Sequence, residues 1–250
     1  MSMATKNNSR FVDFHTHCLP DIDDGARDAA TAHTMLQMVA AQGADTVVAT
    51  PHFYWGHHTV EEFLQKRQDA LAALTLDNAT MPSVLLGAEV LLREGISKED
   101  LRPLCMQGTG ILLVELPFMR PPSWVFEELE EIAYTQRLTV MLAHVDRYMP
   151  WYSGEKLERL LELPNVIVQI NAEALTNRRE FRTLRKWLPT AQRMVLGTDM
   201  HSARSRKPLL DKALSVLSHS RVGRAWLEMI KETTDCVNGN TISEQRGGFI

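Results

Sequence analysis

Residues 11–25 read FVDFHTHCLPDIDDG, a short apolar run followed at once by histidines, aspartates and a glycine. Residues 11–14 carry aromatic and β-branched side chains, a composition that predicts a β-strand. His15 and His17 then stand at the carboxyl end of this strand. In parallel α/β barrels, functional groups gather at the carboxyl ends of the strands. The stretch therefore predicts a fold class and also the edge of the sheet where a site should lie.

The same order, a short apolar strand and then a longer amphipathic segment, recurs along the chain. Each predicted strand is apolar nearly throughout, as in a parallel sheet that is buried on both faces. The predicted strands cover residues 11–14, 46–50, 83–90, 111–116, 139–143, 166–170 and 193–196. The predicted helices cover residues 27–42, 60–76, 124–136, 155–163, 180–188, 209–217 and 222–233.

Seven strands of this kind predict an α/β fold with a closed or nearly closed (β/α) barrel. Because no linker, repeat or low-complexity segment divides the chain, we expect a single domain over residues 1–250. Short flexible tails are predicted at residues 1–10 and from about 237 to 250. A doubly wound open sheet is the alternative that the same pattern allows.

The composition excludes several classes of protein. The chain has 250 residues, of which 44% are hydrophobic, and 27 Lys and Arg against 31 Asp and Glu give a net charge of −4. A mildly acidic chain lacks the basic excess typical of nucleic-acid binding. Its longest apolar runs are far shorter than the about 20 residues that a membrane helix needs. Because no apolar segment follows the first basic residues, no secretion signal is visible, and we expect a cytoplasmic protein.

Polar side chains at the strand ends predict a metal site. Alternate residues of an extended segment point the same way, so His15 and His17 can meet one cation, and Asp199 and His201 repeat that spacing. Imidazole suits Zn, Fe or Mn, whereas carboxylate oxygen shifts the preference toward Mn or Mg. A single His-X-His pair is a weak signal, but six of the seven predicted strands end in His or a carboxylate. The candidate ligands are His15, His17, Asp24, His52, Glu89, Glu115, His144, Asp199 and His201.

Phosphate chemistry based on cysteine is excluded by spacing. A thiolate phosphatase needs Arg six positions after its Cys, so that a guanidinium and backbone amides surround the phosphate. Six positions after the three cysteines stand Asp24, Ile111 and Ile242. A glycine-rich phosphate loop that ends in Lys-Ser or Lys-Thr is also absent from the sequence. If the protein handles phosphate, metal ions and arginines must do it.

Several segments together resemble the polymerase and histidinol phosphatase (PHP) superfamily. The closer resemblance is to the bacterial metal-dependent protein-tyrosine phosphatases of capsule and exopolysaccharide clusters, the CpsB/YwqE group. The His-X-His pair alone is common among hydrolases, but HCLPDIDDG combined with TPH and AHVDRY is more specific. The resemblance is carried by DFHTHCLPDIDDGARD, ATPHFY, LGAEV, VELPF, LAHVDRY and LGTDMHSARSR, which span residues 13–206.

The resemblance implies a distorted (β/α)7 barrel of the PHP type that holds three divalent metal ions. These are usually Mn²⁺, with Fe, Zn or Mg as alternatives. It also implies that Arg147 and Arg206 contact the substrate phosphate, and that Asp24 takes part in catalysis. The implied ligand sets are His15, His17, Glu89 and Asp199 for one ion, Glu89, Glu115 and His144 for a second, and Asp24, His52 and His201 for the third.

The function that the resemblance implies is hydrolysis of phosphotyrosine by attack of a metal-activated hydroxide on phosphorus. The expected substrate is a phosphotyrosine-bearing protein, the tail of a bacterial tyrosine kinase that controls capsular or exopolysaccharide synthesis. The alternatives are another PHP phosphoesterase, acting on histidinol phosphate or oligonucleotides, and a metal-binding regulator without turnover. A metal-dependent amidohydrolase shares His-X-His but commonly uses a bridging Lys or further His, where this chain has Glu89 and Glu115.

Two features leave alternatives open. Asp146 and the pair Asp23 and Asp24 are candidates for a general acid, although each fits a structural hydrogen-bond acceptor equally. Aromatic residues follow the strand ends, and they either grip a tyrosyl ring or pack against the barrel. They are Phe53, Tyr54, Trp55, Phe118, Trp124, Tyr148, Trp151 and Tyr152.

Overall fold

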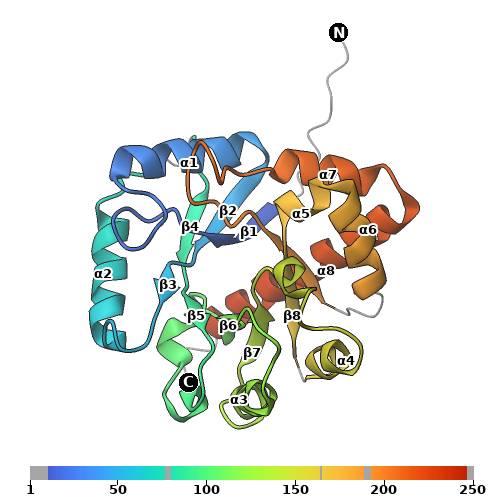
Figure 1. The fold of residues 1–250 in the computed structure, drawn as a ribbon. Coiled ribbons are helices and arrows are strands. Elements are labelled where there is room, and N and C mark those ends of the chain that lie inside the picture. The colour runs from blue at the N-terminus through green and yellow to red at the C-terminus, as the bar shows by residue number, and fades with distance from the viewer. Residues whose placement is uncertain (1–10, 77–79, 164, 189–192, 247–250) are drawn as a thin grey trace.

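The computed structural model describes residues 11–76, 80–163, 165–188 and 193–246, with the side chains of the last helix described as far as residue 238. Nine strands are found in these residues, and they lie at the centre of the molecule (Figure 1). They are β1 (Phe11–Thr16), β2 (Ala44–Ala49), β3 (His52–Phe53), β4 (Ser83–Leu86), β5 (Glu89–Leu91), β6 (Ile111–Glu115), β7 (Thr139–Leu142), β8 (Ile167–Asn171) and β9 (Met194–Gly197).

The helices surround these strands (Figure 1). They are α1 (Ala29–Ala41), α2 (Val60–Ala72), α3 (Ser123–Tyr134), α4 (Glu155–Leu161), α5 (Ala172–Thr176), α6 (Arg178–Trp187), α7 (Leu210–Ser218) and α8 (Arg221–Arg246). Three short 3₁₀ helices at Ile96–Lys98, Arg102–Leu104 and Val145–Tyr148 complete the set in the described residues.

The strands form two parallel sheets, in the orders β1-β2-β4 and β3-β5-β6-β7-β8-β9. The sheets are continuous with each other, because β2 leads into β3 past Thr50-Pro51 and β4 leads into β5 past Gly87-Ala88. Backbone hydrogen bonds cross these breaks, from Gly87 N to Ala49 O (2.8 Å) and from Glu89 N to Pro51 O (3.1 Å). Seven strand positions result, which matches the predicted number.

The barrel closes between its first and last strands. Asp199 N donates to His15 O at 2.8 Å, and His17 N donates to Met200 O at 3.0 Å. These bonds, with the parallel bridge between Thr16 and Met200, connect β1 to the chain that follows β9. The distorted seven-stranded barrel is therefore confirmed, and the alternative of an open sheet is wrong.

Helix α8 covers the amino end of the barrel and lies behind the strands in Figure 1. Its Val237 packs into the cluster of barrel-interior side chains that includes Val12 and Met141. The backbone N–H of Met194, at the start of β9, donates to Thr233 Oγ1 of α8 at 3.3 Å. With the amino end closed by packing, the carboxyl ends of the strands are left for the polar residues.

The structure corrects some predicted boundaries. The strand predicted over 83–90 is two strands, interrupted where Gly87 lies close to Thr50 and Val48. The tail predicted from about residue 237 is helical as far as Arg246, because α8 continues past the predicted end at 233. The predicted tail at 1–10 and residues 247–250 lie outside the described residues. Among the described residues, no helix is both long and apolar enough to cross a bilayer.

Candidate metal centre and active site

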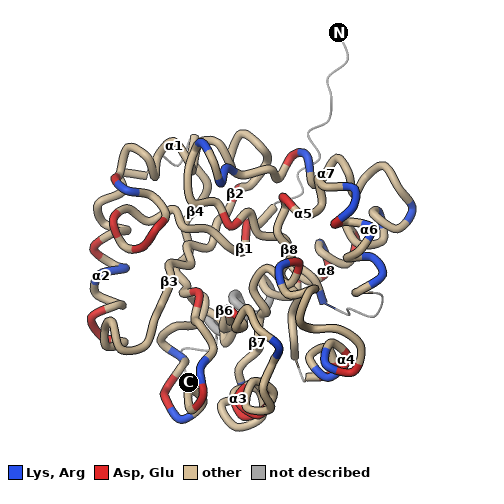
Figure 2. Tube along the Cα trace, viewed as in Figure 1, with Lys and Arg blue, Asp and Glu red and all other residues tan. Residues whose placement is uncertain are grey.

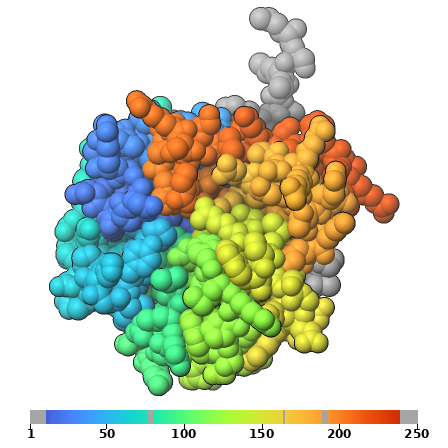
Figure 3. Space-filling model, in the orientation of Figure 1, coloured from blue at the N-terminus to red at the C-terminus, as the bar shows by residue number. Residues whose placement is uncertain are grey.

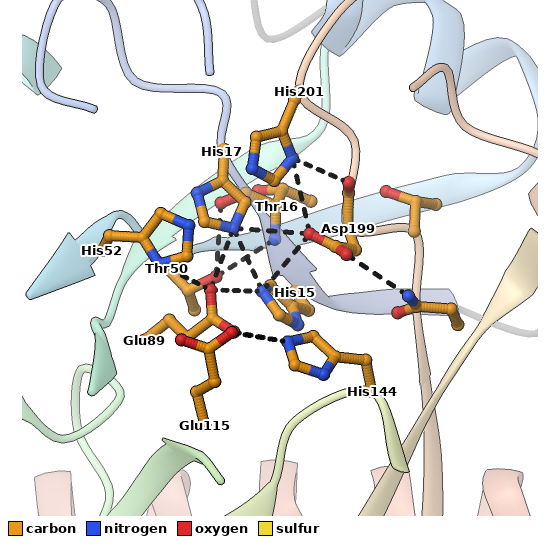
Figure 4. A network of polar contacts seen from close by, with 12 residues as sticks. His15, Thr16, His17, Thr50, His52, Glu89, Glu115, His144, Asp199 and His201 are labelled. Atoms are coloured by element: carbon orange, nitrogen blue, oxygen red, sulfur yellow. Dashed lines mark hydrogen bonds and ion pairs between the residues drawn. The ribbon is translucent and has the colours of Figure 1, made fainter. Parts of the chain in front are cut away.

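The predicted ligands meet at one end of the barrel, where Figure 4 shows the labelled imidazoles and carboxylates pointing toward one another. Acidic positions lie among the central strands, whereas most other charges lie on the outer helices (Figure 2). Ligand atoms lie within 4.8 Å of one another in three groups. The groups are His17, Asp24, His52 and His201, then His15, His17 and Asp199, and then His52, Glu89 and Glu115.

Glu89 is at the middle of the cluster. Its Oε2 lies 3.2 Å from His15 Nε2, 3.3 Å from His17 Nε2 and 3.1 Å from His52 Nδ1. Its Oε1 lies 2.8 Å from His144 Nε2. A carboxylate that reaches four imidazoles from a position 1% exposed is placed to bridge cations. The structure thus brings the predicted residues together. His17 and His52 each belong to two of the three groups.

Asp24 and the last predicted His complete the open side of the cluster. Asp24 Oδ1 lies 3.3 Å from His201 Nε2 and 3.6 Å from His52 Nε2. The Asp24 side chain is 65% exposed, while His201 is 4% exposed. The group that contains Asp24 is therefore the part of the cluster nearest to solvent.

The donor atoms fit divalent cations. His15 Nδ1 lies 3.0 Å from Gln169 Oε1 and His17 Nδ1 lies 2.7 Å from Asp23 Oδ2, which fixes hydrogen on each Nδ1. The two Nε2 atoms then approach each other to 3.1 Å, so a proton or a cation must lie between their lone pairs. Other buried polar atoms here make only ion-pair contacts or none, without a well-aligned hydrogen bond: Glu89 Oε2, His52 Nδ1, His144 Nδ1 and His201 Nε2. Such orphaned atoms are costly in a folded protein, and metal ligation would satisfy those that face the centre.

The surroundings shift the pKa values of the cluster residues in opposite directions. Burial opposes protonation of His17, but hydrogen bonds with Asp23 and Glu89 outweigh it and raise its pKa to about 10. Burial and the charge of Glu89 raise the pKa of Glu115 to about 7. Burial and the neighbouring His17 lower the pKa of His201 to about 4. Without cations, His17 would thus hold a proton at neutral pH, and a cation bound there would displace it, because metal ligands must be deprotonated.

Two of the ligand residues have an unusual backbone conformation, with positive φ. His144 and Asp199 have φ values of 28° and 51°, in a region that costs on the order of 1 kcal/mol or more for residues other than glycine. A close approach requires glycine at two further positions. A Cβ on Gly25 would overlap His17 O, and a Cβ on Gly197 would lie 2.6 Å from His15 Cβ.

Two residues that hold the ligands in place, Gln169 and Asn171, were not predicted as site residues. Gln169, fully buried, accepts a hydrogen bond from His144 N at 2.5 Å in addition to its contact with His15. Its Nε2 donates to Asn171 Oδ1 at 3.1 Å, and Asn171 Nδ2 donates to Asp199 Oδ2 at 3.3 Å. The signal in the sequence was a lone amide within the apolar strand VIVQI, since a buried polar side chain needs partners.

Asp23 also holds a ligand in place, and its contacts bear on its predicted role as a general-acid candidate. It accepts hydrogen bonds from His17, from Gly25 N at 2.9 Å and from His52 N at 3.0 Å. Burial raises its pKa, but these bonds outweigh the burial and lower the pKa to about 2. A group so acidic is ionised at neutral pH and orients His17, so the structural alternative holds for Asp23.

Both predicted arginines reach the open side of the cluster. Arg147 Nη2 and Arg206 Nη2 donate to the same atom, Asp199 Oδ2, the second at 2.8 Å. Arg206 Nη1 lies 4.0 Å from Asp24 Oδ2. Both side chains remain about one-third exposed. Two permanently charged guanidinium groups at one solvent-accessible edge can bind an anion.

The eight aromatic residues differ in exposure, and three of them, Trp55, Trp124 and Trp151, are partly buried against the core. Phe53, Tyr148 and Tyr152 are at most 1% exposed and belong to the core, which confirms packing for these three. Tyr54 and Phe118 are 37% and 44% exposed. Segments from both halves of the chain border the centre of this face, as Figure 3 shows by colour.

Comparison with known proteins identifies the family of this chain. The family model for capsular polysaccharide synthesis, CpsB/CapC, matches residues 11–236, from the first strand into the last helix. The chain belongs to the CpsB/CapC family. It is 24% identical to the tyrosine-protein phosphatase CpsB of Streptococcus pneumoniae over 83% of this chain and 89% of that protein. It is 29% identical to the tyrosine-protein phosphatase YwqE of Bacillus subtilis over 54% of each chain.

Solved structures show the same fold for this CpsB/CapC family member. One from the crystallographic work on YwqE of B. subtilis and CpsB of S. pneumoniae, described as metal-dependent tyrosine phosphatases, superposes with a TM-score of 0.73. It is 23% identical and covers 92% of this chain and 95% of that one. The histidinol phosphate phosphatase of Lactococcus lactis, solved with zinc, histidinol and phosphate, has a TM-score of 0.53 at 12% identity, covering 84% of this chain and 93% of that one. The PHP-type barrel is common to all of them.

Proposed function

We propose that this chain is a metal-dependent phosphatase that hydrolyses phosphotyrosine in proteins. The observation that carries the proposal is the cluster of five histidines and four carboxylates at the carboxyl ends of the strands, with two arginines at its open edge. Membership of the CpsB/CapC family and the tyrosine phosphatase activity named for its relatives support the choice of substrate.

Three divalent cations, with Mn²⁺ as the proposed metal, would be held by the residues of the cluster. The proposed sets are His15, His17, Glu89 and Asp199, then Glu89, Glu115 and His144, and then Asp24, His52 and His201. Bound divalent ions would supply Lewis acidity and lower the pKa of water from 15.7 to about 7, so that a nucleophile is available at neutral pH.

Side chains of the protein would bind the phosphoryl group and orient the metal ligands. Arg147 and Arg206 would turn from Asp199 Oδ2 to the phosphoryl oxygens and hold them through paired N–H donors. Gln169 and Asp23 would keep His15 and His17 in the tautomer that presents Nε2 to the centre. Asp24, the most exposed member of the cluster, would lie beside the incoming phosphate and complete the catalytic set.

The leaving group makes modest demands on the protein. A tyrosine phenolate has a pKa near 10, so its departure does not require a strong general acid. Burial raises the pKa of Asp146 to about 7, but its Oδ1 accepts a hydrogen bond from Asn171 N at 2.9 Å. We therefore assign Asp146 to positioning the 169–171 strand end.

The substrate protein is proposed to be the phosphorylated tail of a bacterial tyrosine kinase that controls capsular or exopolysaccharide synthesis. The family's connection with capsular polysaccharide synthesis supports this pathway. The kinase partner and the cytoplasmic location stay predictions from the sequence.

A substrate panel tests the proposal. Protein purified without added ions is assayed for its metal content, then loaded with Mn²⁺ and offered a phosphotyrosyl peptide, histidinol phosphate and a short oligonucleotide. We expect release of phosphate from the peptide at a kcat/KM at least about 100-fold above the other two, a transition-state difference of about 2.7 kcal/mol. Faster turnover of histidinol phosphate or the oligonucleotide would assign a different phosphoesterase activity, and binding of the peptide without phosphate release would indicate a regulator.

A further inference from the structure

Two exposed aromatic rings stand on opposite parts of the ligand cluster. Tyr54 stacks on His52 with ring centroids 5.1 Å apart and planes 23° apart. Phe118 stacks on His144 with ring centroids 5.8 Å apart and planes 19° apart. Each exposed ring therefore lies on the solvent side of an imidazole of the cluster. The organic part of a phosphate ester bound at the cluster would extend toward the same side.

The two rings come from the ends of strands that are separated by one other strand. Tyr54 follows β3 and Phe118 follows β6, and β5 lies between these strands in the sheet. The ends of β3 and β6 are therefore two strand intervals, about 9.5 Å, apart. The loops carry the two rings beyond these ends, and the Phe118 ring lies against His144, which follows β7. An aromatic ring bound between two others is attracted to each when the centroids are 4.5–7 Å apart.

Local structure holds Phe118 in this exposed position. Met119 N donates to Pro117 O at 2.8 Å, a tight turn centred on Phe118. The ring is 5.3 Å from Tyr148 and 6.0 Å from Trp151, measured between centroids. Because Tyr148 itself is buried, Phe118 packs against a ring that is held in the core.

The second ring is held by a different turn. Tyr54 O accepts a hydrogen bond from His57 N at 3.2 Å, and Gly56 takes a φ of 87°, the arrangement of a type II turn with glycine at its third position. Exposed rings that are fixed before binding lose little conformational entropy when they grip a ligand.

We propose that Tyr54 and Phe118 form an aromatic clamp that selects aryl phosphates by holding the leaving-group ring between them. The clamp rests on the proposed function, and it names the two residues that would distinguish phosphotyrosine from phosphoserine or phosphothreonine. It contributes to binding of the ring and takes no part in proton or phosphoryl transfer.

Binding of two small phosphonates isolates the contribution of the ring. The Kd values of benzylphosphonate and methylphosphonate are measured by calorimetry on the Mn²⁺-loaded protein and on Tyr54→Ala, Phe118→Ala and Tyr54→Phe. We expect each alanine variant to lose about 10-fold of the preference for the benzyl compound, with the Kd of methylphosphonate changed less than about twofold. Tyr54→Phe, which keeps the ring, should keep the preference.

Tyr134 supplies a matched control. Among the described residues it is the most exposed large apolar side chain, at 65%, and it lies at the end of α3. Tyr134→Ala should leave both Kd values unchanged. In kinetic assays, kcat/KM for a phosphotyrosyl peptide should fall about 10-fold in each clamp variant, and that for a phosphoseryl peptide should stay constant.

The outcomes separate the clamp from the function on which it rests. An enzyme that hydrolyses the phosphotyrosyl peptide but keeps its benzyl preference in both alanine variants overturns the clamp alone. An equal loss of affinity for both phosphonates also overturns it, because the rings would then act only through the cluster. A wild-type protein that releases no phosphate from the peptide refutes the proposed function and the clamp together.

Discussion

Replacement of Gln169 by methionine should disable the metal centre without removing a single ligand. Methionine has a similar length and fills the same buried volume, but it neither accepts nor donates the hydrogen bonds of the amide. The substitution removes the acceptor of His144 N, the partner of His15 Nδ1 and the donor to Asn171. The Gln169→Met variant therefore tests whether the amide, and not the packing, orients the cluster.

The magnitude follows from the groups left without partners. Each buried donor or acceptor that loses its partner costs about 1–3 kcal/mol, and at least two such groups remain, at His144 N and Asn171 Oδ1. The expected loss in the free energy of unfolding is thus about 2–6 kcal/mol. Loss of an orienting partner also costs about 10- to 100-fold in metal affinity, because the tautomer of His15 is no longer fixed.

Urea denaturation and titration with Mn²⁺ measure the two effects. Gln136→Met is the matched control, because Gln136 also makes three hydrogen bonds to its surroundings, with Leu101 N, Ser97 O and Glu99 O. The control should lose stability but keep its Mn²⁺ affinity. If Gln169→Met bound Mn²⁺ as tightly as the wild type, the proposed role of the amide would be wrong.

Three further predictions concern packing, charge and metal. In Gly197→Ala, the new Cβ would lie 2.6 Å from Gln169 Nε2, so urea denaturation should show a free energy of unfolding lower by about 1–3 kcal/mol. Wild-type stability would contradict the close approach. Burial raises the pKa of Glu128, but hydrogen bonds from two N–H groups in residues 95–97 outweigh it and lower the pKa. Because the folded pKa is lowered, this stabilisation is present at neutral pH and is lost progressively as the pH falls below about 4.5. Glu128→Gln should therefore cost about 1–2 kcal/mol in the free energy of unfolding at pH 7 and less as the pH falls, and a cost independent of pH would refute the charge effect. Chelation with EDTA should lower the melting temperature, and Mn²⁺ at 100 times its Kd should raise the free energy of unfolding by about 2.7 kcal/mol. A melting temperature that changes with neither treatment would contradict a metal centre.

The sequence predicted the barrel and the ligands because both depend on local order along the chain. A strand buried on both faces is apolar throughout, and its last residues face the site, so the positions of His15, Glu89 and His144 at strand ends could be predicted from the amino-acid order alone. Parallel strands bring their carboxyl ends to one edge whatever the intervening helices do. Residues distant in the chain could therefore be assigned to one cluster.

The rest depends on contacts that the sequence does not specify. The role of Gln169 follows from its position beside Gly197 and His15, which only closure of the barrel creates. The interruption at Gly87 arises where Thr50 and Val48 lie close to it. Helix α8 continues past residue 233 while it packs against the amino end of the barrel, and its later turns give no helical pattern strong enough to extend the prediction.

The same limit applies to the aromatic residues. Their positions after the strand ends could be read from the sequence, but whether each ring is exposed could not. Tyr148 and Tyr152 are buried between loops, whereas Phe118 is turned outward by the bend at Pro117 and Met119. Exposure is a property of the assembled loops, and it separates the packing residues from the proposed clamp.

The central claim is that the cluster at the carboxyl end of the barrel is a metal centre that hydrolyses phosphotyrosine. Its most direct test is the rate of phosphate release from a phosphotyrosyl peptide by the Mn²⁺-loaded protein, before and after chelation, and by the variant that combines His15→Ala with Asp199→Ala. The account predicts release that stops on chelation, returns with Mn²⁺ and falls at least about 100-fold in the variant, since the ions supply several kcal/mol of transition-state stabilisation. A variant that releases phosphate at the wild-type rate would contradict it.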